Sequence, residues 1–142
     1  MDAPELPPKR EKFCYVGVPA IFKLHMACKH LRSAFPSHGC YLVGSATERP
    51  DWRDVDVVMM LSDNDFRRLF PTALLQGQWE FDPRWQILTV AISDWLSTQT
   101  GLPVDFKFQP TKWANEKHDK PRHPLGITYV ANDGPMPAWE ES

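Results

Sequence analysis

The segment Asp54-Val-Asp-Val-Val-Met-Met-Leu61 is the part of the chain that decides the fold. Two acidic residues stand at its start, and an apolar run rich in valine follows, as is typical of a buried strand. Successive side chains of a strand point to opposite faces, so we expect Asp54 and Asp56 on one face and Val55 and Val57 on the other. The segment therefore predicts a strand with an acidic start and an apolar continuation.

Two amphipathic helices are expected, one before and one after this strand in the sequence. The first begins at Pro19, and its apolar residues recur at helical spacing: Ile21, Leu24, Cys28, Leu31 and Phe35. The second lies between the cap Asp82-Pro83 and the glycine at position 101, with an apolar face formed by Trp85, Leu88, Ile92, Trp95 and Leu96. This periodicity predicts that both tryptophans of the second helix belong to the core.

Two further strands are expected, at residues 40–43 and 104–108. In the later strand Asp105 and Lys107 share one face, and apolar residues occupy the other. Ser62 resembles an N-cap and predicts a short helix after the central strand. Helices interleaved with three strands predict an α/β (α+β) fold, with a small mixed sheet of about three to five strands and helices packed on it.

The length of 142 residues allows one domain. Residues 1–12 contain three prolines and are expected to form a flexible arm. We expect the core to span residues 13–109, and residues 110–142 to be a proline-rich extension of the same domain, with one further strand suggested at 126–130. The charged segment 115–126 could fold over a site or be a solvated connection.

Composition narrows the classes of partner and compartment. The net charge of −2 makes long duplex DNA an unexpected partner, because binding its backbone requires several unopposed cations. The longest clean apolar run, residues 57–61, is far shorter than a membrane span, so no membrane partner is expected. Three cysteines, an odd number without dense spacing, favour a reducing, cytoplasmic location over a disulfide scaffold.

One group of cysteines and histidines has the residue types of a zinc site, namely Cys28-x-His30 and His38-x-Cys40. Residues two apart on a helix point away from each other, so Cys28 and His30 are poorly placed to bind one ion. We therefore interpret these residues as buried thiols and surface histidines.

Three carboxylates stand in strands where apolar residues are expected: Asp54, Asp56 and Asp105. Carboxylates on one strand face repel each other unless a cation lies between them. Mg²⁺ or Mn²⁺ prefers such oxygen ligands, and a third carboxylate from a neighbouring strand is the arrangement that holds two ions for phosphoryl chemistry. The alternative is that these aspartates only mark a strand start and an exposed edge.

These residues carry a family resemblance. Gly44-Ser45, eight intervening residues, Asp54-Val-Asp56 and then Val104-Asp105-Phe106 resemble the motif of the nucleotidyltransferase superfamily related to DNA polymerase beta, over about residues 19–108. The resemblance implies transfer of a nucleoside monophosphate from a nucleoside triphosphate to an acceptor hydroxyl, with release of pyrophosphate. The acceptor could be a small molecule, an RNA end or a protein hydroxyl.

The resemblance also implies residue roles. Gly44 and Ser45 would hold the triphosphate, Asp54 and Asp56 would bind two Mg²⁺ (or Mn²⁺) ions, and Asp105 would share the second ion and help deprotonate the hydroxyl. Nearby side chains are candidates for contact with the nucleotide, with ordinary surface or packing roles as the alternative: Arg49, Arg53 and Lys107 for phosphate, and Trp52 for stacking on a base.

A second class of function stays open at this point. Small members of the superfamily include binding or regulatory proteins, such as antitoxin-type partners, with little or no turnover. The three intact carboxylates favour an enzyme, because an inert scaffold has no need of them.

Overall fold

A computed structural model describes the protein over six segments. These are residues 14–35, 37–74, 78–117, 122–126, 129–130 and 134–135. The arm predicted at residues 1–12 lies outside the described residues. Within them, no helix has the length and apolar character needed to cross a membrane.

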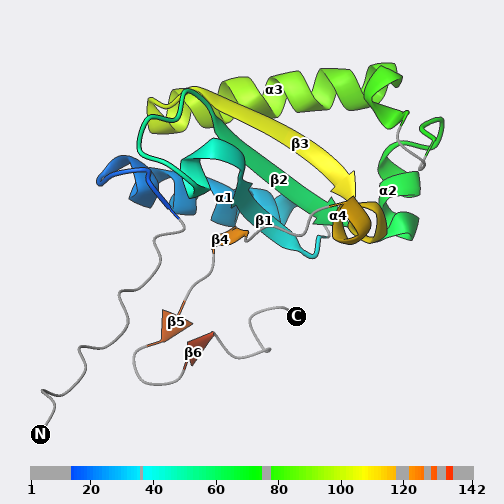
Figure 1. Ribbon diagram of the computed structural model, residues 1–142. Coiled ribbons are helices and arrows are strands. Elements are labelled where there is room, and N and C mark those ends of the chain that lie inside the picture. The colour runs from blue at the N-terminus through cyan, green and yellow to red at the C-terminus, as the bar shows by residue number, and fades with distance from the viewer. Residues whose placement is uncertain are drawn as a thin grey trace, which may run out of the picture.

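Four strands form one mixed sheet in the order β3-β2-β1-β4 (Figure 1). Their bounds are β1 Gly39–Val43, β2 Val55–Leu61, β3 Val104–Pro110 and β4 His123–Leu125. β1 pairs antiparallel with both β2 and β4, whereas β2 and β3 run parallel. A separate pair joins β5 Tyr129–Val130 to β6 Gly134–Pro135.

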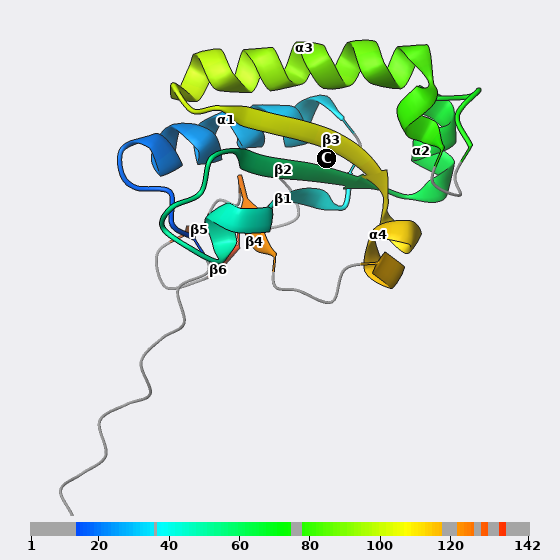
Figure 2. The ribbon, with the colours of Figure 1, turned by 45° about the horizontal axis from the view of Figure 1, so that its top comes forward.

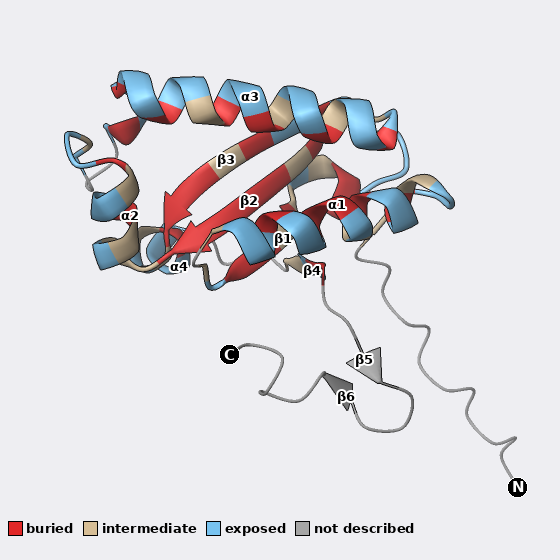
Figure 3. Ribbon diagram, turned by 180° about the vertical axis from the view of Figure 1, so that it is seen from behind, coloured by how far each residue is buried: buried red, intermediate tan, exposed pale blue. Residues whose placement is uncertain are grey.

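Two long helices, α1 Ala20–Ala34 and α3 Pro83–Thr100, cover one face of this sheet (Figures 2 and 3). Two short helices, α2 Asp63–Leu69 and α4 Thr111–Lys117, directly follow β2 and β3. Two 3-10 turns complete the described fold, η1 Gly44–Thr47 after β1 and η2 Trp79–Phe81 before α3. The predicted α+β fold, a small mixed sheet with helices packed on it, is confirmed.

The core lies between the sheet and the two long helices. Alternate residues of β2 and β3 point into it and are fully buried, as the alternating pattern predicts (Val55, Val57, Met59, Leu61, Phe106, Phe108). They meet the buried stripes of α1 and α3, including Leu24, Cys28 and Leu96. Burial of each such side chain contributes roughly 1.5–3 kcal/mol.

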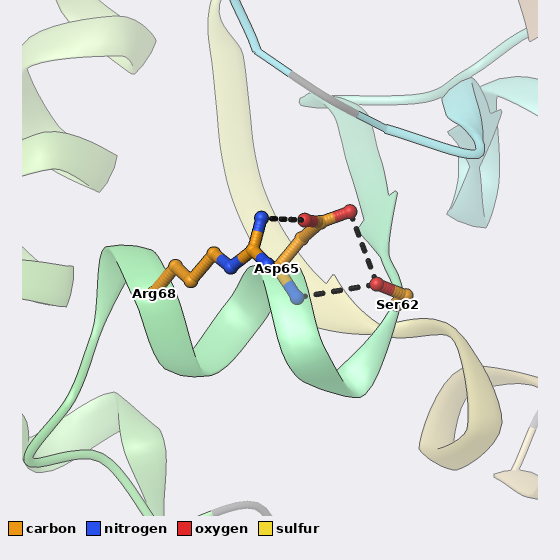
Figure 4. Close-up of polar contacts among 3 residues, drawn as sticks. All are labelled: Ser62, Asp65 and Arg68. Carbon is orange, nitrogen blue, oxygen red and sulfur yellow. Dashed lines mark hydrogen bonds and ion pairs between the residues drawn. The ribbon is translucent and has the colours of Figure 1, made fainter.

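The ends of α2 and α3 follow the capping residues expected from the sequence. Ser62 Oγ accepts the Asp65 N–H at 3.1 Å and donates to Asp65 Oδ2 at 3.0 Å, while Arg68 stands 3.8 Å from the other carboxylate oxygen (Figure 4). At α3, Asp82 accepts the Trp85 N–H, and Gly101 ends the helix in the left-handed conformation with φ of 72°.

The prediction that Trp95 belongs to the core is wrong, because the side chain is 37% exposed. The buried stripe of α3 runs along Trp85, Thr89, Ile92, Leu96 and Thr100. Two threonines therefore occupy core-facing positions, while apolar residues beside the stripe face outward. Apolar character alone does not say which side of a broad apolar stripe is buried.

The extension after residue 110 contains three elements that the sequence does not predict, α4, β4 and β6, whereas β5 lies within the strand suggested at 126–130. Just after β4, Gly126 lies against α1 with φ of 73°, so close that an added Cβ would stand 2.8 Å from the Lys29 backbone nitrogen. Its N–H donates to His25 Nδ1 at 3.1 Å, and its carbonyl accepts from Arg32 at 3.0 Å. These contacts hold the end of β4 on α1.

Candidate active site

The parallel register of β2 and β3 places Asp56 directly beside Asp105. Neighbouring strands lie about 4.8 Å apart, so the two carboxylates belong to one rung of the sheet. Both point to the face opposite the core, since the residues flanking each of them are buried among the core residues. Two acidic residues far apart in sequence therefore come together at the start of two parallel strands.

Asp54 lies one residue outside the strand in which the sequence predicts it. β2 begins at Val55, so Asp54 lies just before the strand and is exposed. Its charge still acts on the pair. The pKa of Asp56 is raised, first by burial and then by the negative charges of Asp105 and Asp54, while Lys107 opposes the shift.

Negative charge thus gathers around one half-buried carboxyl group. Across the part of the chain that the structure describes, no cluster of three or more His, Cys, Asp or Glu side chains lies close enough together to hold a metal ion. The donor chemistry nevertheless fits Mg²⁺ or Mn²⁺, because carboxylate oxygens are the ligands these ions prefer and a cation would relieve the repulsion at Asp56.

Gly44 packs directly against this carboxylate. Its φ of +75° is left-handed, and an added Cβ would overlap Asp56 Oδ2 and lie 3.2 Å from Cγ. Only glycine fits such a position. The turn that follows is held by Thr47, whose hydroxyl donates to the Gly44 carbonyl at 2.6 Å. The backbone after β1 is therefore fixed beside the carboxylates.

A cavity of about 300 Å³ opens over the carboxylate rung. It is bounded by the end of β1, by η1, by β2 and β3, and by the residue before β4. The polar and charged side chains that line it are Thr47, Glu48, Asp56, Asp105, Lys107, Gln109 and Arg122.

Of the cations expected at the nucleotide, the structure places only Lys107 in the cavity wall. Arg49 is exposed and forms an ion pair with Asp51 at 3.5 Å, and Arg53 is exposed outside the lining. Ser45 also lies outside the lining, one residue beyond Gly44, and its carbonyl accepts the Arg49 N–H at 3.0 Å. The glycine of the Gly-Ser pair therefore reaches the cavity, and the serine does not.

Sequence reasoning missed Gln109 and Arg122. Gln109 continues the alternation of Asp105 and Lys107 along β3, so extending the predicted strand by one residue would have found it. Arg122 is not singled out by the sequence, but it belongs to the charged segment 115–126, for which the sequence leaves open a fold over the site or a solvated connection. The structure places Arg122 in the cavity wall, directly before β4. Its guanidinium donates to the Ala114 carbonyl at 3.0 Å, to Asn115 Oδ1 at 3.0 Å and to Met60 Sδ at 3.2 Å.

Trp52 has a packing role. Its Nε1 donates to the Tyr15 carbonyl at 3.0 Å, and its ring packs against the core. The interpretation of Trp52 as a base-stacking candidate is therefore not supported by its position.

The cysteines and histidines of the zinc-like pattern lie apart from the cavity. Cys28 and Cys40 are both buried, and a hydrogen bond between the two thiols, together with burial, raises the pKa of Cys28. His30 is exposed on α1, and His38 Nδ1 lies 2.7 Å from Thr111 Oγ1. All three cysteines are free.

Comparison of the chain with protein-family models, with curated proteins and with solved structures finds no match in any of the three. The arrangement of the described residues is therefore what bears on function.

Proposed function

We propose that the protein is a metal-dependent nucleotidyltransferase that moves a nucleoside monophosphate from a nucleoside triphosphate to an acceptor hydroxyl. The observation that carries the proposal is the rung formed by Asp56 and Asp105 on parallel strands, with the backbone of Gly44 packed against it. The same two aspartates and the same glycine carry the resemblance to the superfamily related to DNA polymerase beta.

Asp56 and Asp105, with Asp54 beside them, would hold Mg²⁺ or Mn²⁺. A bound ion of this kind supplies charge neutralisation for the triphosphate and stabilises the negative charge that develops at phosphorus. The half-buried Asp56 suits this role, because its raised pKa reflects negative charge that a cation would offset.

Asp105 is the exposed member of the pair and is free to accept the proton of the attacking hydroxyl. The acceptor oxygen forms a bond to the α-phosphorus, and the bond from that phosphorus to the bridging oxygen breaks. Pyrophosphate leaves with the electron pair. Lys107 lines the same cavity one rung further along and is positioned to offset charge on the reacting groups.

Gly44 contributes backbone rather than a side chain. Its left-handed conformation brings the chain close to Asp56 without a Cβ between them, and a backbone turn of this kind leaves amide groups for phosphate oxygens. The short bond from Thr47 to its carbonyl keeps the turn in place before a substrate arrives.

The test is transfer of label from an α-labelled nucleoside triphosphate in the presence of Mg²⁺ or Mn²⁺. We expect metal-dependent transfer that Asp56→Asn and Asp105→Asn each reduce by about 10²-fold or more, since each removes charge at the reacting phosphorus. Asp94→Asn is the matched control, because Asp94 is exposed on α3 and lies outside the cavity lining.

A different pattern of results would refute the proposed enzymatic activity. It would consist of no metal-dependent transfer, no change in melting temperature with metal and nucleotide, and Asp56 and Asp105 variants that behave like the parent. That pattern would instead favour the alternative function, a binding or regulatory protein with little or no turnover.

A further inference from the structure

The face that carries the carboxylates continues along β2 and β3 as two more rungs. Asp56 pairs with Asp105, Val58 with Lys107, and Met60 with Gln109, and alternate residues of a strand share one face. With a rise of about 3.3 Å per residue, Gln109 lies about 13 Å along β3 from Asp105. Over that length β3 presents an acidic, then a cationic, then a neutral polar side chain, while β2 presents the buried apolar Val58 and Met60 beyond Asp56.

Gln109 is buried at the inner end of this face, and its amide oxygen has no partner among the described residues. The residue is 9% exposed, it lines the cavity, and its Oε1 is buried without a hydrogen bond from the described residues. Native proteins rarely leave a buried acceptor unpaired, and such a group is matched by a ligand N–H or O–H when one binds.

Arg122 brings a guanidinium to the same rung. It contacts Met60, the register partner of Gln109, and its contacts to Met60, Asn115 and Ala114 occupy three of its N–H groups. A guanidinium has five, so two have no partner among the described residues and can donate to a ligand. Neither Arg122 nor Lys107 forms an ion pair with any carboxylate of the described chain. Two cations, neither of them in an ion pair with a described carboxylate, thus flank the unpaired amide oxygen.

The size of the cavity favours a small molecule over a polymer as its occupant. Its volume of about 300 Å³ is at the lower end of the range for small-molecule pockets. The contacts of Arg122 with Ala114 and Asn115 bring α4 to the inner end of the site, where a polymer would need open space.

From these observations we infer that the acceptor is a small hydroxyl-bearing molecule that also carries an anionic group. Its hydroxyl lies at Asp105, its anionic group lies between Lys107 and Arg122, and it donates one hydrogen bond to Gln109. This inference rests on the proposed function. The reaction joins the acceptor oxygen to the α-phosphorus and releases pyrophosphate, so it needs no reactant beyond the acceptor and the nucleoside triphosphate.

The first test offers the protein four fractions of a cell extract, each with an α-labelled nucleoside triphosphate and Mg²⁺. The fractions are anionic small molecules, neutral small molecules, RNA and protein. We expect label in the anionic small-molecule fraction. Label confined to any of the other three would overturn the inference and leave the proposed function standing. Absence of metal-dependent label from all four counts against both.

The second test uses Gln109→Leu, with the exposed Gln99→Leu on α3 as the matched control. We expect the apparent KM for the acceptor in the anionic fraction to rise about tenfold, because the N–H or O–H of the bound acceptor molecule no longer finds the Gln109 oxygen. The KM for the nucleotide should change less than twofold. The melting temperature should not fall, since the change removes an unpaired buried acceptor.

Lys107→Met provides a second variant that leaves the contacts of α4 intact. It should also raise the acceptor KM, and adding salt should weaken acceptor binding by the parent more than by this variant. If neither variant changes the acceptor KM, or if both change the two KM values equally, the acceptor does not bind at this end of the cavity.

Discussion

The two faces of the β2–β3 pair consist of alternate residues of the same strands, yet they differ in almost every property. One face is apolar, fully buried and covered by α1 and α3, with Phe106 and Phe108 at its centre. The other carries Asp56, Asp105 and Lys107 around an open cavity, and its far end is closed by a small buried cluster of Val58, Met60 and Ala114 of α4. The comparison teaches that one face holds the fold together and the other is available for chemistry. Substitutions on the two faces should therefore separate stability from activity.

The largest expected effect breaks the apolar face. Phe106→Ala should lower the free energy of unfolding by about 3–5 kcal/mol, because it leaves a cavity at a fully buried position. The adjacent Asp105→Asn should change it by less than about 0.5 kcal/mol, since Asp105 is exposed. Urea unfolding measures both. Equal losses would show that the two faces are not independent.

The second-largest effect is expected at Gly44, which directly follows β1 and packs against Asp56 of β2. Gly44→Ala should cost about 2–3 kcal/mol, because it combines a left-handed backbone with overlap on the Asp56 carboxylate. Gly101→Ala is the matched control. That residue has φ of 72° but nothing within 4 Å of its added Cβ, so we expect about 1 kcal/mol. Thermal unfolding of both variants isolates the overlap, and equal costs would argue that Gly44 does not press on Asp56.

On the face that carries the cavity, one substitution is expected to stabilise the protein. Asp56→Asn should stabilise the protein at neutral pH by less than about 1 kcal/mol, since the group is half exposed and solvent screens it. The sign follows from its raised pKa, because the folded state holds this proton more tightly and loses stability as the pH rises through the folded pKa. Below its ordinary value of 3.8 the gain should vanish. If Asp56→Asn instead destabilises the protein at neutral pH, burial and the neighbouring negative charges do not disfavour the ionised Asp56.

The smallest effect concerns the contact between β4 and α1. Burial lowers the pKa of His25, with a further contribution from His123, and burial also lowers that of His123. Above about pH 6.5 both rings are neutral in the folded and unfolded states, so this contribution to stability is complete. As the pH falls below that value, the unfolded chain takes up protons that the folded protein resists, and stability declines.

His25→Asn should flatten this decline, because an amide oxygen can accept the Gly126 N–H without titrating. The measurement is the free energy of unfolding at about pH 7.5 and about pH 5.5, where we expect a difference below about 1 kcal/mol between parent and variant. An unchanged slope would mean that His25 does not sense the pH.

The sequence predicts the elements with strong local signals. Helices α1 and α3 follow from apolar spacing, and Ser62, Asp82 and Gly101 mark helix ends because their side chain or backbone satisfies groups that the helix leaves free. That Asp56 and Asp105 share a site is predicted by the resemblance of the motif, and not by the strand patterns themselves. Their register, one rung rather than an offset, depends on packing of the whole sheet.

What the sequence does not predict depends on contacts between distant segments. β4 is only three residues long and contains a proline, so its pairing with β1 and its seat on α1 have no periodic signal. Arg122 reaches the cavity only because of that pairing. Asp54 was expected within the strand, and packing instead begins β2 one residue later.

The pairing of β4 with β1 has a consequence for how the protein behaves among its own copies. Without β4, the backbone of β1 would present an unsatisfied row of hydrogen-bonding groups, the kind of surface that recruits strands from other molecules. β4 occupies that row over Cys40–Leu42, and Pro124 within it has no N–H to offer a newcomer. The segment that delivers Arg122 to the cavity thus also guards this edge of the sheet against aggregation.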